Sequence, residues 1–388
     1  MKFMRRKVGD KMPTMKELQI LQKLDYETKN KKTDLRITEW VEYWGIDNVA
    51  VSISGGLDST VLLHKVRKLY PTVKAVSIKA IECKENYKII DNFENVIILK
   101  PKYSQVEIIK RFGYPLGSKK VAKSIRRLQN PSPNNLKSRN LALTGITSEG
   151  KPAPRFKLAK RWLKFIESPF KISEQCCYYM KEKPLADYAK KNNIHYFIGT
   201  KAEDSETRTT GYLNTGCNSF TDTGNSNPLG FWTHQDVLRY TVENNLDISE
   251  IYGEIIKQDN GEYKTTKASR SGCFICGFGL HMEKQPNRFQ RMQKDDPGLY
   301  NFAINKLGYG ELLDFAEIPY RIDQMPERIN FGKQISFLDN VKSQKEKINL
   351  VYKDHFDRKA KNHKFITESD MERFISNNKI QVVGWMNG

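Results

Sequence analysis

The segment at residues 48–70 constrains the fold more than any other part of this sequence. A short β-branched run at residues 48–53 (NVAVSI) leads directly into SGGLDS, and apolar residues at helical spacing follow. Further strand patterns stand at residues 73–78, 96–99 and 195–198. Strand, glycine-rich turn, helix and strand in this order predict an α/β protein with a parallel twisted sheet flanked by helices.

The SGGLDS turn at residues 54–59 has the composition of an anion-binding loop. Gly55 and Gly56 let the backbone approach an anion closely, and the start of a helix favours phosphate. Asp58 would repel a bare phosphate unless a divalent cation lies between them, so the turn predicts a nucleoside triphosphate with Mg²⁺. Its spacing differs from that of the G-x-x-x-x-G-K-[ST] phosphate loop. The alternative is an ordinary turn in which Asp58 or Ser59 caps the helix.

Four of the six cysteines form a second candidate site. Cys176 and Cys177 are adjacent, and Cys273 and Cys276 form a Cys-x-x-Cys pair that directs two thiolates to one point. Adjacent cysteines fit poorly around one tetrahedral zinc ion, but each can bind a different iron of a cubane. The pattern therefore favours a [4Fe–4S] cluster over structural zinc. The alternatives are buried thiols without a metal or a thiol-redox pair.

The positive charge of the chain is concentrated in one segment. The 388 residues carry a formal charge of +20, and residues 119–164 hold thirteen Lys or Arg and one acid, Glu149, which gives this segment +12. Such a density predicts a nucleic acid as partner, with Trp162 and Phe165 as candidates for stacking on a base. The alternative is a solvated basic surface.

Composition and hydropathy limit the class of protein. Hydrophobic residues make up 38% of the chain, which is enough for a sizeable core. The apolar runs are too short to span a membrane, the first residues lack the apolar stretch of a secretory signal, and the cysteines are too sparse for a disulfide scaffold. We therefore expect a cytoplasmic protein. Its expected parts are a basic helical extension at residues 1–45, a domain at 46–310 with the basic insertion at 119–164 and a cysteine-bearing loop at 261–284, and a C-terminal extension at 311–388.

Several motifs resemble one family. SGGLDS after a strand resembles the PP-loop of ATP pyrophosphatases, which split ATP between the α- and β-phosphates to adenylate a substrate. Residues 199–208 (GTKAEDSETR) resemble the G-x-R-A-x-E-S-x-x-R segment of the phosphoadenosine phosphosulfate (PAPS) reductase family. Residues 227–237 resemble that family's Pro…Trp-Thr-x-x-Asp-Val segment, and residues 114–119 (YPLGSK) its Tyr-Pro-x-x-Ser-Lys. The chain departs from the family at residues 79–83, which replace an Asp-Thr-Gly stretch, and at Lys201, which replaces an Arg.

The resemblance implies roles for particular residues. The cysteine pattern is similar to that of cluster-bearing adenylylsulfate (APS) reductases, so Cys176, Cys177, Cys273 and Cys276 are the expected cluster ligands. Catalysis is expected to involve Asp58, Ser59, Lys119 and Arg208. The adenine nucleotide is expected to bind Ser54, Gly55, Gly56, Asp58, Ser59, Gly199, Lys201 and Arg208.

The function that follows is sulfur transfer. We expect a PP-loop enzyme that uses ATP and Mg²⁺ to adenylate a nucleic acid, tRNA or DNA, and then thiolates it with sulfur delivered near a [4Fe–4S] cluster. A sulfur- or electron-donor protein would be a partner. One alternative is an APS or PAPS reductase that releases sulfite, although no cysteine follows Cys276 to act as the nucleophile that assimilatory reductases use. Another is a nucleotide-sensing protein with a structural cluster.

Overall fold

The chain divides into two compact units, Met1–Met325 and Pro326–Gly388. The structure is a computed structural model, and the departure from the family motif at residues 80–83 falls outside the part that it describes. The described residues are 12–79, 84–273 and 275–325, together with the strands at 348–353, 361–365 and 381–387.

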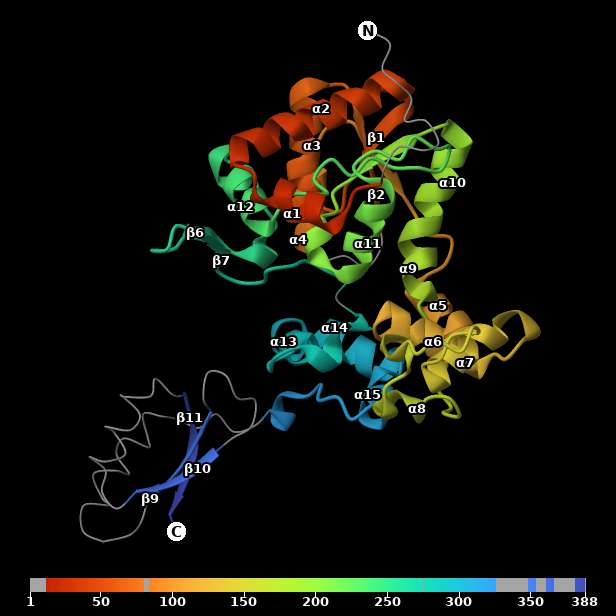
Figure 1. The fold of residues 1–388 in the computed structure, drawn as a ribbon, viewed down its shortest axis with the longest axis vertical. Helices are drawn as coiled ribbons and strands as arrows, with labels where there is room; N and C mark the ends of the chain where they lie inside the picture. Colours follow the sequence, from red (N-terminus) through yellow and green to blue (C-terminus); the bar gives the residue numbers. More distant parts are fainter. Residues whose placement is uncertain are drawn as a thin grey trace. The chain divides into compact units, whose positions relative to one another are not determined.

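A four-stranded parallel sheet forms the centre of the first unit (Figure 1). Its strands lie in the order β3-β2-β1-β5, and β1 pairs with both β2 and β5. The chain therefore leaves β1 in one direction for β2 and β3, and later returns on the other side as β5. The predicted parallel α/β sheet is confirmed. The strands are β1 (Val49–Ser52), β2 (Lys74–Ile78), β3 (Val96–Leu99) and β5 (His195–Ile198).

Helices connect the strands and cover the sheet. Two of them begin with side-chain caps that the sequence provides: Thr14 and Glu17 form a capping box on α1, and Asp25 accepts from the Thr28 N–H at the start of α2. The helices are α1 (Met15–Lys23), α2 (Tyr26–Trp44), α3 (Leu57–Leu69), α4 (Lys84–Asp91), α5 (Gln105–Phe112), α6 (Lys119–Gln129), α7 (Leu136–Thr144), α8 (Lys160–Leu163), α9 (Gln175–Cys177), α10 (Lys183–Asn192), α11 (Glu206–Thr215), α12 (His234–Glu243), α13 (Arg288–Asp295), α14 (Pro297–Asn301) and α15 (Tyr309–Phe315).

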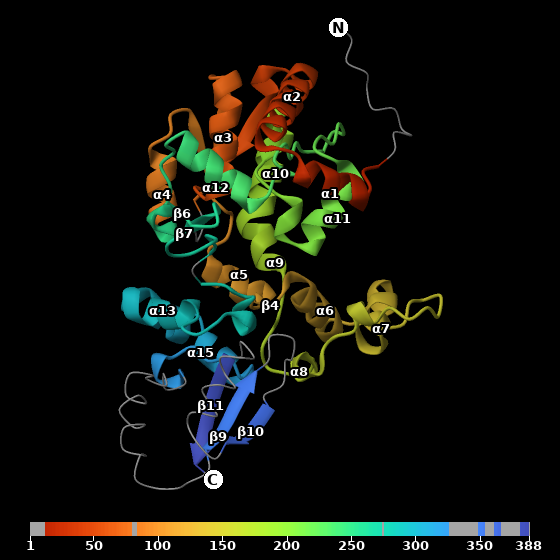
Figure 2. The same ribbon diagram turned by 60° about the vertical axis from the view of Figure 1, so that its left-hand side comes forward.

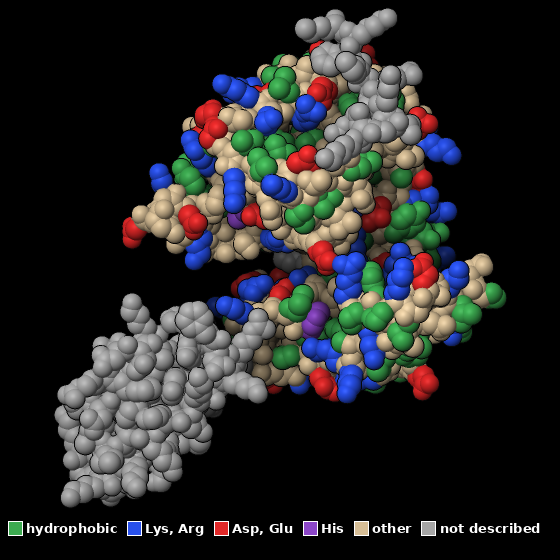
Figure 3. All heavy atoms as spheres, in the orientation of Figure 1, with side chains coloured by type: hydrophobic (Ala, Val, Ile, Leu, Met, Phe, Trp, Pro, Cys, Tyr) green, Lys and Arg blue, Asp and Glu red, His purple; other side chains and the backbone are tan. Residues whose placement is uncertain are grey.

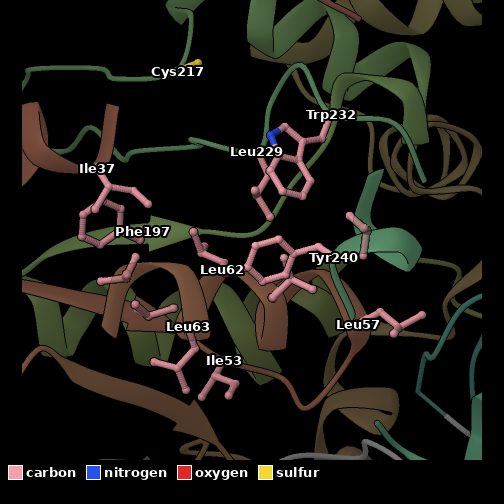
Figure 4. Packing of buried hydrophobic residues seen from close by; sticks show 14 of the residues in the cluster. Ile37, Ile53, Leu57, Leu62, Leu63, Phe197, Cys217, Leu229, Trp232 and Tyr240 are labelled. Atoms are coloured by element: carbon pink, nitrogen blue, oxygen red, sulfur yellow. The ribbon is translucent and has the colours of Figure 1, made fainter. Parts of the chain in front are cut away.

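Helices cover both faces of the sheet at β1, which explains why this strand is apolar up to Ser52. On one face, Val51 packs with α2, α3 and α12 in a core that includes Leu62 and Trp232 (Figure 4). On the other face, Ala50 packs against α10 through residues such as Tyr188. Successive residues of β1 therefore serve opposite cores, as the alternation of side chains along a strand requires.

A second hydrophobic core joins segments that are far apart in the sequence (Figure 2). It contains Ile125 of α6, Trp162 of α8, Phe289 of α13 and Leu312 of α15. The short strands β4 (Leu116–Gly117) and β8 (Gly277–Phe278) pair in parallel beside it. The basic segment at residues 119–164 is therefore folded into helices, and α6 directs its apolar stripe into this core.

The helix that carries Cys176 and Cys177 changes its winding directly after them. The α-helical turn α9 passes into a π-helical turn at Tyr178–Glu182 and then into α10. Pro184 lies in the first turn of α10 and has no N–H to donate to the preceding turn. The wider π-turn accommodates this missing bond, and such turns often occur at functional sites.

Shorter sheets complete the description. The hairpin of β6 (Ile255–Lys257) and β7 (Tyr263–Thr265) occupies part of the segment that the sequence indicated as a loop. In the second unit, β9 (Ile348–Lys353), β10 (Lys361–Phe365) and β11 (Gln381–Asn387) form an antiparallel sheet in the order β10-β9-β11. Among the described helices, none has the length and apolar character that crossing a membrane requires.

Candidate functional site

The SGGLDS turn lies where the strand order of the sheet reverses. It follows the carboxyl end of β1, and residues 199–201 follow the neighbouring carboxyl end of β5. In open α/β sheets, ligands bind in the crevice at such a point. The fold thus brings the two nucleotide-binding motifs predicted from the sequence to one edge.

The turn is closed by Ser59. Its hydroxyl donates to the Gly56 carbonyl at 3.0 Å and accepts from the Ser54 N–H at 3.2 Å. Gly56 is the N-cap residue of α3, and no side chain caps this helix. The alternative in which Asp58 or Ser59 caps the helix is therefore wrong, because Ser59 bonds within the loop and Asp58 points to a different partner.

Two glycines allow neighbouring segments to reach the turn. Gly55 has a φ of +70°, and a Cβ there would lie 2.2 Å from the carbonyl oxygen of Asn86. Asn86 is fully buried on α4 and donates to the Ser54 carbonyl at 3.1 Å. A Cβ on Gly199 would lie 2.9 Å from the carbonyl oxygen of Asp58. Side chains at either glycine would force the loop open.

The charges at the turn form one network. Lys201, which is 1% exposed, forms an ion pair with Asp58 and lies 3.4 Å from an oxygen of Asp204. Asp204 also pairs with Arg208 and, at 3.5 Å, with Arg270. Lys201 thus balances the negative charge of Asp58, and the Asp58 carboxylate does not need a divalent cation to balance it. Arg270 is a member of this network that the sequence motifs did not indicate.

These charges alter two titrations. Burial acts to raise the pKa of Asp204, but Lys201, Arg208 and Arg270 outweigh it and lower the pKa below its usual range. Burial lowers the pKa of His234, and the nearby Lys201 ammonium adds to this effect. At neutral pH the site therefore contains an ionised Asp204 and a neutral His234.

Tyr252 and Ser271 complete the loop's surroundings. The Leu57 N–H at the start of α3 donates to the Tyr252 hydroxyl at 3.3 Å, and this hydroxyl donates to the Ser271 Oγ at 2.8 Å. The Tyr252 hydroxyl thus accepts a hydrogen bond from a backbone N–H of the kind that binds phosphate at the start of a helix. Sequence patterns did not indicate either residue, since each lies about 200 positions from the loop in an irregular segment.

A polar cavity of ≈ 460 Å³ begins at the same network. Lys201 and Arg208 line it together with Thr200, and its far wall is formed by the loop at residues 219–227. Arg208 is about half exposed. Two predicted nucleotide-binding residues, Lys201 and Arg208, thus line the same cavity.

The four predicted cluster ligands meet at a different place. Cys176, Cys177, Cys273 and Cys276 line one small cavity of ≈ 20 Å³, together with Gln105, Pro115, Met180, Lys181 and Ile275. Within the described residues, no three His, Cys, Asp or Glu side chains have the arrangement that a single metal ion would require. The four thiols therefore share a cavity without forming a compact single-ion site.

The thiols are electrostatically coupled. Burial raises the pKa of Cys176 and Cys177 above the ordinary value, and it raises the pKa of Cys276 to about 12. Repulsion from neighbouring thiolates adds to the rise at Cys176 and Cys276, whereas the Lys119 ammonium opposes the rise at Cys177. Arg288 donates to the Cys276 carbonyl at 3.1 Å and opposes the rise at Cys276. Thiols in this situation remain protonated unless a positive group lies between them.

Lys119 lies beside this cavity. Ser118 caps α6 through the Val121 N–H, and the Lys119 ammonium lies 3.1 Å from Glu182. Burial acts to lower the pKa of Lys119, but Cys177 and Glu182 raise it above its ordinary value. The structure thus brings this predicted catalytic residue to the cysteines, whereas Asp58, Ser59 and Arg208 surround the turn after β1.

The two places are joined by a very short stretch of chain. Ser271, which accepts from Tyr252 at the PP-loop, is separated from Cys273 by Gly272 alone. Two peptide units span at most about 7 Å between Cα atoms. The surroundings of the loop and one residue of the cysteine cavity therefore lie close together.

Residues 137–277 match the family model of the phosphoadenosine phosphosulfate reductase domain. Over this stretch the chain is similar to the PAPS reductase domain family. The match contains all four cysteines of the cavity and the segment at residues 199–208, and it begins after the SGGLDS turn. No curated protein matches the chain significantly.

Three of the solved structures to which the chain is similar have low sequence identity to it. PAPS reductase from Candida auris, in a phosphate complex, has 14% identity and a TM-score of 0.32 over 62% of this chain and 92% of that one. NH₃-dependent NAD synthetase from Campylobacter jejuni has 16% identity and a TM-score of 0.30 over 79% and 100%. The U34-tRNA thiolase NcsA from Methanococcus maripaludis, with its [4Fe–4S] cluster, has 13% identity and a TM-score of 0.34 over 82% and 90%.

The basic segment, which extends into the PAPS reductase domain, presents its cations on helices α6, α7 and α8 and the loops between them (Figure 3). Five of its cations have acidic partners, among them Arg126, which forms two bonds to Glu174. On α6, Lys120, Lys123 and Arg127 lie three and four residues apart and therefore on one face. Among the described residues none of these three forms an ion pair, although Lys123 acts on Glu174 at longer range.

The predicted stacking residues are not available to a base. Trp162 and Phe165 are 3% and 0% exposed and belong to the second core, so that expectation is wrong. Phe156 is the exposed aromatic residue between them and α6, and the Lys120 ammonium and Arg155 guanidinium lie 4.4 and 4.9 Å from its ring centre. The apolar spacing of Trp162 and Phe165 reflects packing instead.

Proposed function

We propose that this chain is a PP-loop enzyme of the PAPS reductase family that binds an adenine nucleotide and transfers sulfur to a nucleic acid with the help of a [4Fe–4S] cluster. One observation carries the proposal. Four cysteines from two distant segments line one cavity, and Gly272 alone separates Cys273 from a residue that contacts the surroundings of the PP-loop.

The donor set fits a cluster better than a single ion. A cubane takes one thiolate at each of four irons, so its ligands stand farther apart than the four ligands of one zinc ion. The four thiols share one cavity, and adjacent cysteines such as Cys176 and Cys177 bind separate irons more readily than one tetrahedral ion. A bound iron–sulfur core would supply the positive charge that ionises these thiols and would supply a site for sulfur chemistry.

The residues of the turn would bind and orient the nucleotide. The start of α3 and the Lys201 ammonium would face the phosphates, and Arg208 would hold a phosphate or sulfate group in the polar cavity. A substrate oxygen would attack the α-phosphorus, the bond to the β-phosphate would break, and pyrophosphate would leave. Sulfur would then displace AMP from the adenylated atom. Mg²⁺ remains a prediction from the sequence, since Lys201 already balances Asp58.

The acceptor would bind the basic face of α6. Like charges four residues apart destabilise a helix, and Lys123 and Arg127 stand at this spacing without an ion pair among the described residues. A phosphodiester backbone would neutralise them. Arg155, which lies 3.6 Å from Glu206 on α11, connects this segment to the helix that lines the polar cavity.

The cluster is tested by anaerobic purification. We expect a brown protein with absorption near 400 nm, on the order of what thiolate-to-iron transitions give, and about four irons per chain. Replacing Cys176 or Cys273 by Ser should remove the iron. Cys217 provides a matched control, because it lies in the first core, and Cys217→Ser should retain the iron. A colourless protein with one zinc ion per chain would refute the cluster.

The reaction is tested by supplying ATP, sulfide and single-stranded or transfer RNA to the loaded protein. The proposal predicts AMP, pyrophosphate and sulfur in the nucleic acid, all lost in Lys201→Met. Sulfite release from adenylyl sulfate, with no nucleic-acid product, would instead establish a reductase. Nucleotide binding without turnover of any of these substrates would establish a sensor.

A further inference from the structure

The polar cavity beside the PP-loop extends beyond the residues that the proposed nucleotide would contact. Its volume of ≈ 460 Å³ lies in the range of small-molecule sites, and it follows α11 from Arg208 to Gly216. No residue of the PP-loop lines it, although residues 54–59 all belong to the described part of the chain. The cavity therefore offers space for a second ligand beside a nucleotide on the PP-loop.

The cavity and the PP-loop lie on opposite sides of β5. The strand β1, which leads into the PP-loop, pairs with one edge of β5. On the other edge, the Ser226 carbonyl accepts from the Ile198 N–H at 2.8 Å, and the loop at residues 219–227 thus continues the sheet beyond β5. Lys201 follows β5, pairs with Asp58 of the PP-loop and also lines the cavity. A ligand in the cavity and a nucleotide on the PP-loop would therefore meet at Lys201.

The lining has one charged end and an otherwise neutral surface. Lys201 and Arg208 are its charged residues, and among the described residues no Asp or Glu lines it. Phosphate groups are bound by cations and by the start of a helix, so the part of a ligand that lies beyond Arg208 should be uncharged and rich in hydrogen-bonding groups. The polar side chains beyond Arg208 include Thr215, Ser219, Thr221, Thr223, Asn225 and Asn227.

Asn227 has hydrogen-bond donors available on this surface. Its Oδ1 accepts from the Thr200 hydroxyl at 2.7 Å, which fixes the side-chain amide. Among the described residues no acceptor is found for its Nδ2 group. Amide N–H groups of this kind donate to the carbonyl oxygens and ring nitrogens on the edges of nucleic-acid bases.

Gly211 gives the cavity space that a side chain would fill. A glycine inside a helix is less favourable than an alanine, and here no atom lies within 4 Å of an added Cβ, so close packing does not require it. Gly230, by contrast, would place a Cβ 2.6 Å from the Tyr212 ring. Because Gly211 lines the cavity, a side chain at this position would extend into it.

The basic segment reaches the charged end of the cavity. A guanidinium nitrogen of Arg155 lies 3.6 Å from Glu206, the first residue of α11, and the next two residues line the cavity. Lys120, on the basic face of α6, donates to the Arg155 carbonyl at 2.8 Å. A strand whose phosphates lie on this face is therefore led past Arg155 to the cavity.

We propose that the polar cavity holds one unpaired base of the nucleic acid while the adenine nucleotide occupies the PP-loop. The inference rests on the proposed function and names the part of the nucleic acid that enters the site. The base lies over Gly211, accepts from Asn227 and meets the nucleotide at Lys201, and the phosphates of the strand stay outside on the basic face of α6. Enzymes that modify a base take it out of the stack in this way, because a stacked base is inaccessible.

The test compares two single-stranded oligonucleotides of equal length, one of mixed sequence and one without bases, in fluorescence-anisotropy titrations at fixed salt. Both contain the same phosphates, so the ratio of their affinities measures the contribution of the bases. The unaltered protein should bind the oligonucleotide with bases about 10-fold more tightly, on the order of one base contact. Experiments with RNA and with DNA show which of the two gives the larger ratio.

Three variants locate this contribution. Gly211→Leu fills the cavity and should bring the ratio close to one, while ATP binding by the PP-loop is retained. Asn227→Asp keeps an oxygen for the Thr200 hydroxyl but removes the N–H donors, so it should lower the ratio. Asn214→Leu introduces the same side chain on α11 outside the lining and should leave the ratio unchanged.

The outcomes separate this inference from the proposed function. An unchanged ratio in Gly211→Leu would overturn the inference, and the nucleic acid would remain the proposed substrate. Loss of ATP binding in Gly211→Leu with an unchanged ratio would assign the cavity to the adenine nucleotide and also overturn it. If neither oligonucleotide binds the unaltered protein, the proposed function itself fails, and the inference fails with it.

Discussion

Lys201 shows how a single residue sets the charge balance of the PP-loop. The family motif has an arginine at this position, whose planar fork suits one bidentate partner. A lysine ammonium is a point charge, and here it faces two carboxylates, Asp58 and Asp204, from a fully buried position. Where an arginine would form a bidentate bond to one partner, Lys201 therefore balances the charge of two carboxylates.

Lys201→Met should destabilise the fold by about 3–5 kcal/mol, because removing one partner of a buried ion pair leaves the other charge uncompensated. Urea unfolding measures this loss. Arg208 pairs with the same Asp204 from a half-exposed position, so Arg208→Met should cost less than about 1 kcal/mol. Equal losses for the two variants would contradict the network described.

Gly55→Ala should impair the loop itself. Its φ of +70° and the Asn86 carbonyl 2.2 Å from the added Cβ should cost about 1–3 kcal/mol and abolish nucleotide binding. Gly211 lies inside α11 with no atom within 4 Å of an added Cβ, so Gly211→Ala should stabilise the protein by about 1 kcal/mol. Thermal unfolding and ATP titration of both variants test this pair, because the two predicted changes in stability have opposite signs.

Single residues differ in how far the sequence reveals them. Gly55 and Asp58 stand within a local motif whose physical purpose is evident from adjacent residues. Tyr252 and Ser271 reach the loop only through tertiary structure, and their own neighbourhood contains no repeated pattern. Trp162 was misread because an aromatic residue among cations fits both a stacking surface and the apolar side of a short amphipathic helix. Only the packing partners distinguish the two.

Helix α6 combines two opposing tendencies. Its apolar residues Ala122, Ile125 and Leu128 are buried in the second core, and packing rather than charge pairing stabilises it. Its outer face contains cations at repelling positions. An element built in this way gains stability when an anion binds, and it loses little when its cations are removed.

Lys123→Ala/Arg127→Ala should therefore weaken nucleic-acid binding without harming the fold. Each lost phosphate contact reduces the slope of log K against log [salt] by about 0.7 for a single strand, so the double variant should lower it by about 1.4. Lys190→Ala/Lys191→Ala on α10 removes the same charge from another surface helix and should leave the slope unchanged. A similar loss from both pairs would indicate only a general effect of net charge.

Helices and strands could be predicted from the sequence where the pattern of apolar residues was local. The strands of the sheet and the helix after the PP-loop appear as β-branched runs and a helical stripe in the chain. The hairpin β6–β7 was not anticipated, because its three-residue strands are shorter than any alternation can define. The second core could not be predicted either, since α6 and α15 meet across almost 200 positions.

At the scale of the molecule, partly buried histidines should govern stability in mildly acidic solution. Burial lowers the pKa of His64, His195, His234 and His281 below the value of 6.5 that an unfolded chain has. Below that pH the unfolded chain binds protons that the folded chain does not, so the free energy of unfolding falls as the pH falls. Unfolding in urea should require less denaturant at pH 5.5 than at pH 7.5.

The titration of carboxylates does not contribute to the change in the free energy of unfolding between pH 7.5 and 5.5. Asp204 and Glu174 have lowered pKa values, so their contribution to stability is lost only as the pH falls below about 5, outside the range from pH 7.5 to 5.5. His64 accepts from or donates to the Tyr240 hydroxyl, and an asparagine can do the same. His64→Asn should therefore reduce the loss between pH 7.5 and 5.5, and an unchanged loss would exclude His64 as a contributor.

The single residue between Ser271 and Cys273 makes the two halves of the site thermodynamically dependent. A phosphate that took the Leu57 N–H would remove one of the two hydrogen bonds that hold the Tyr252 hydroxyl, and Tyr252 and Ser271 could then shift together. Cys273 is attached two positions further on, so its freedom changes with the occupancy of the loop. Because linkage is reciprocal, a group that immobilises Cys273 must alter nucleotide affinity by the same factor. If the chain functions as proposed, oxygen damage at the cysteines would therefore also change its affinity for the nucleotide.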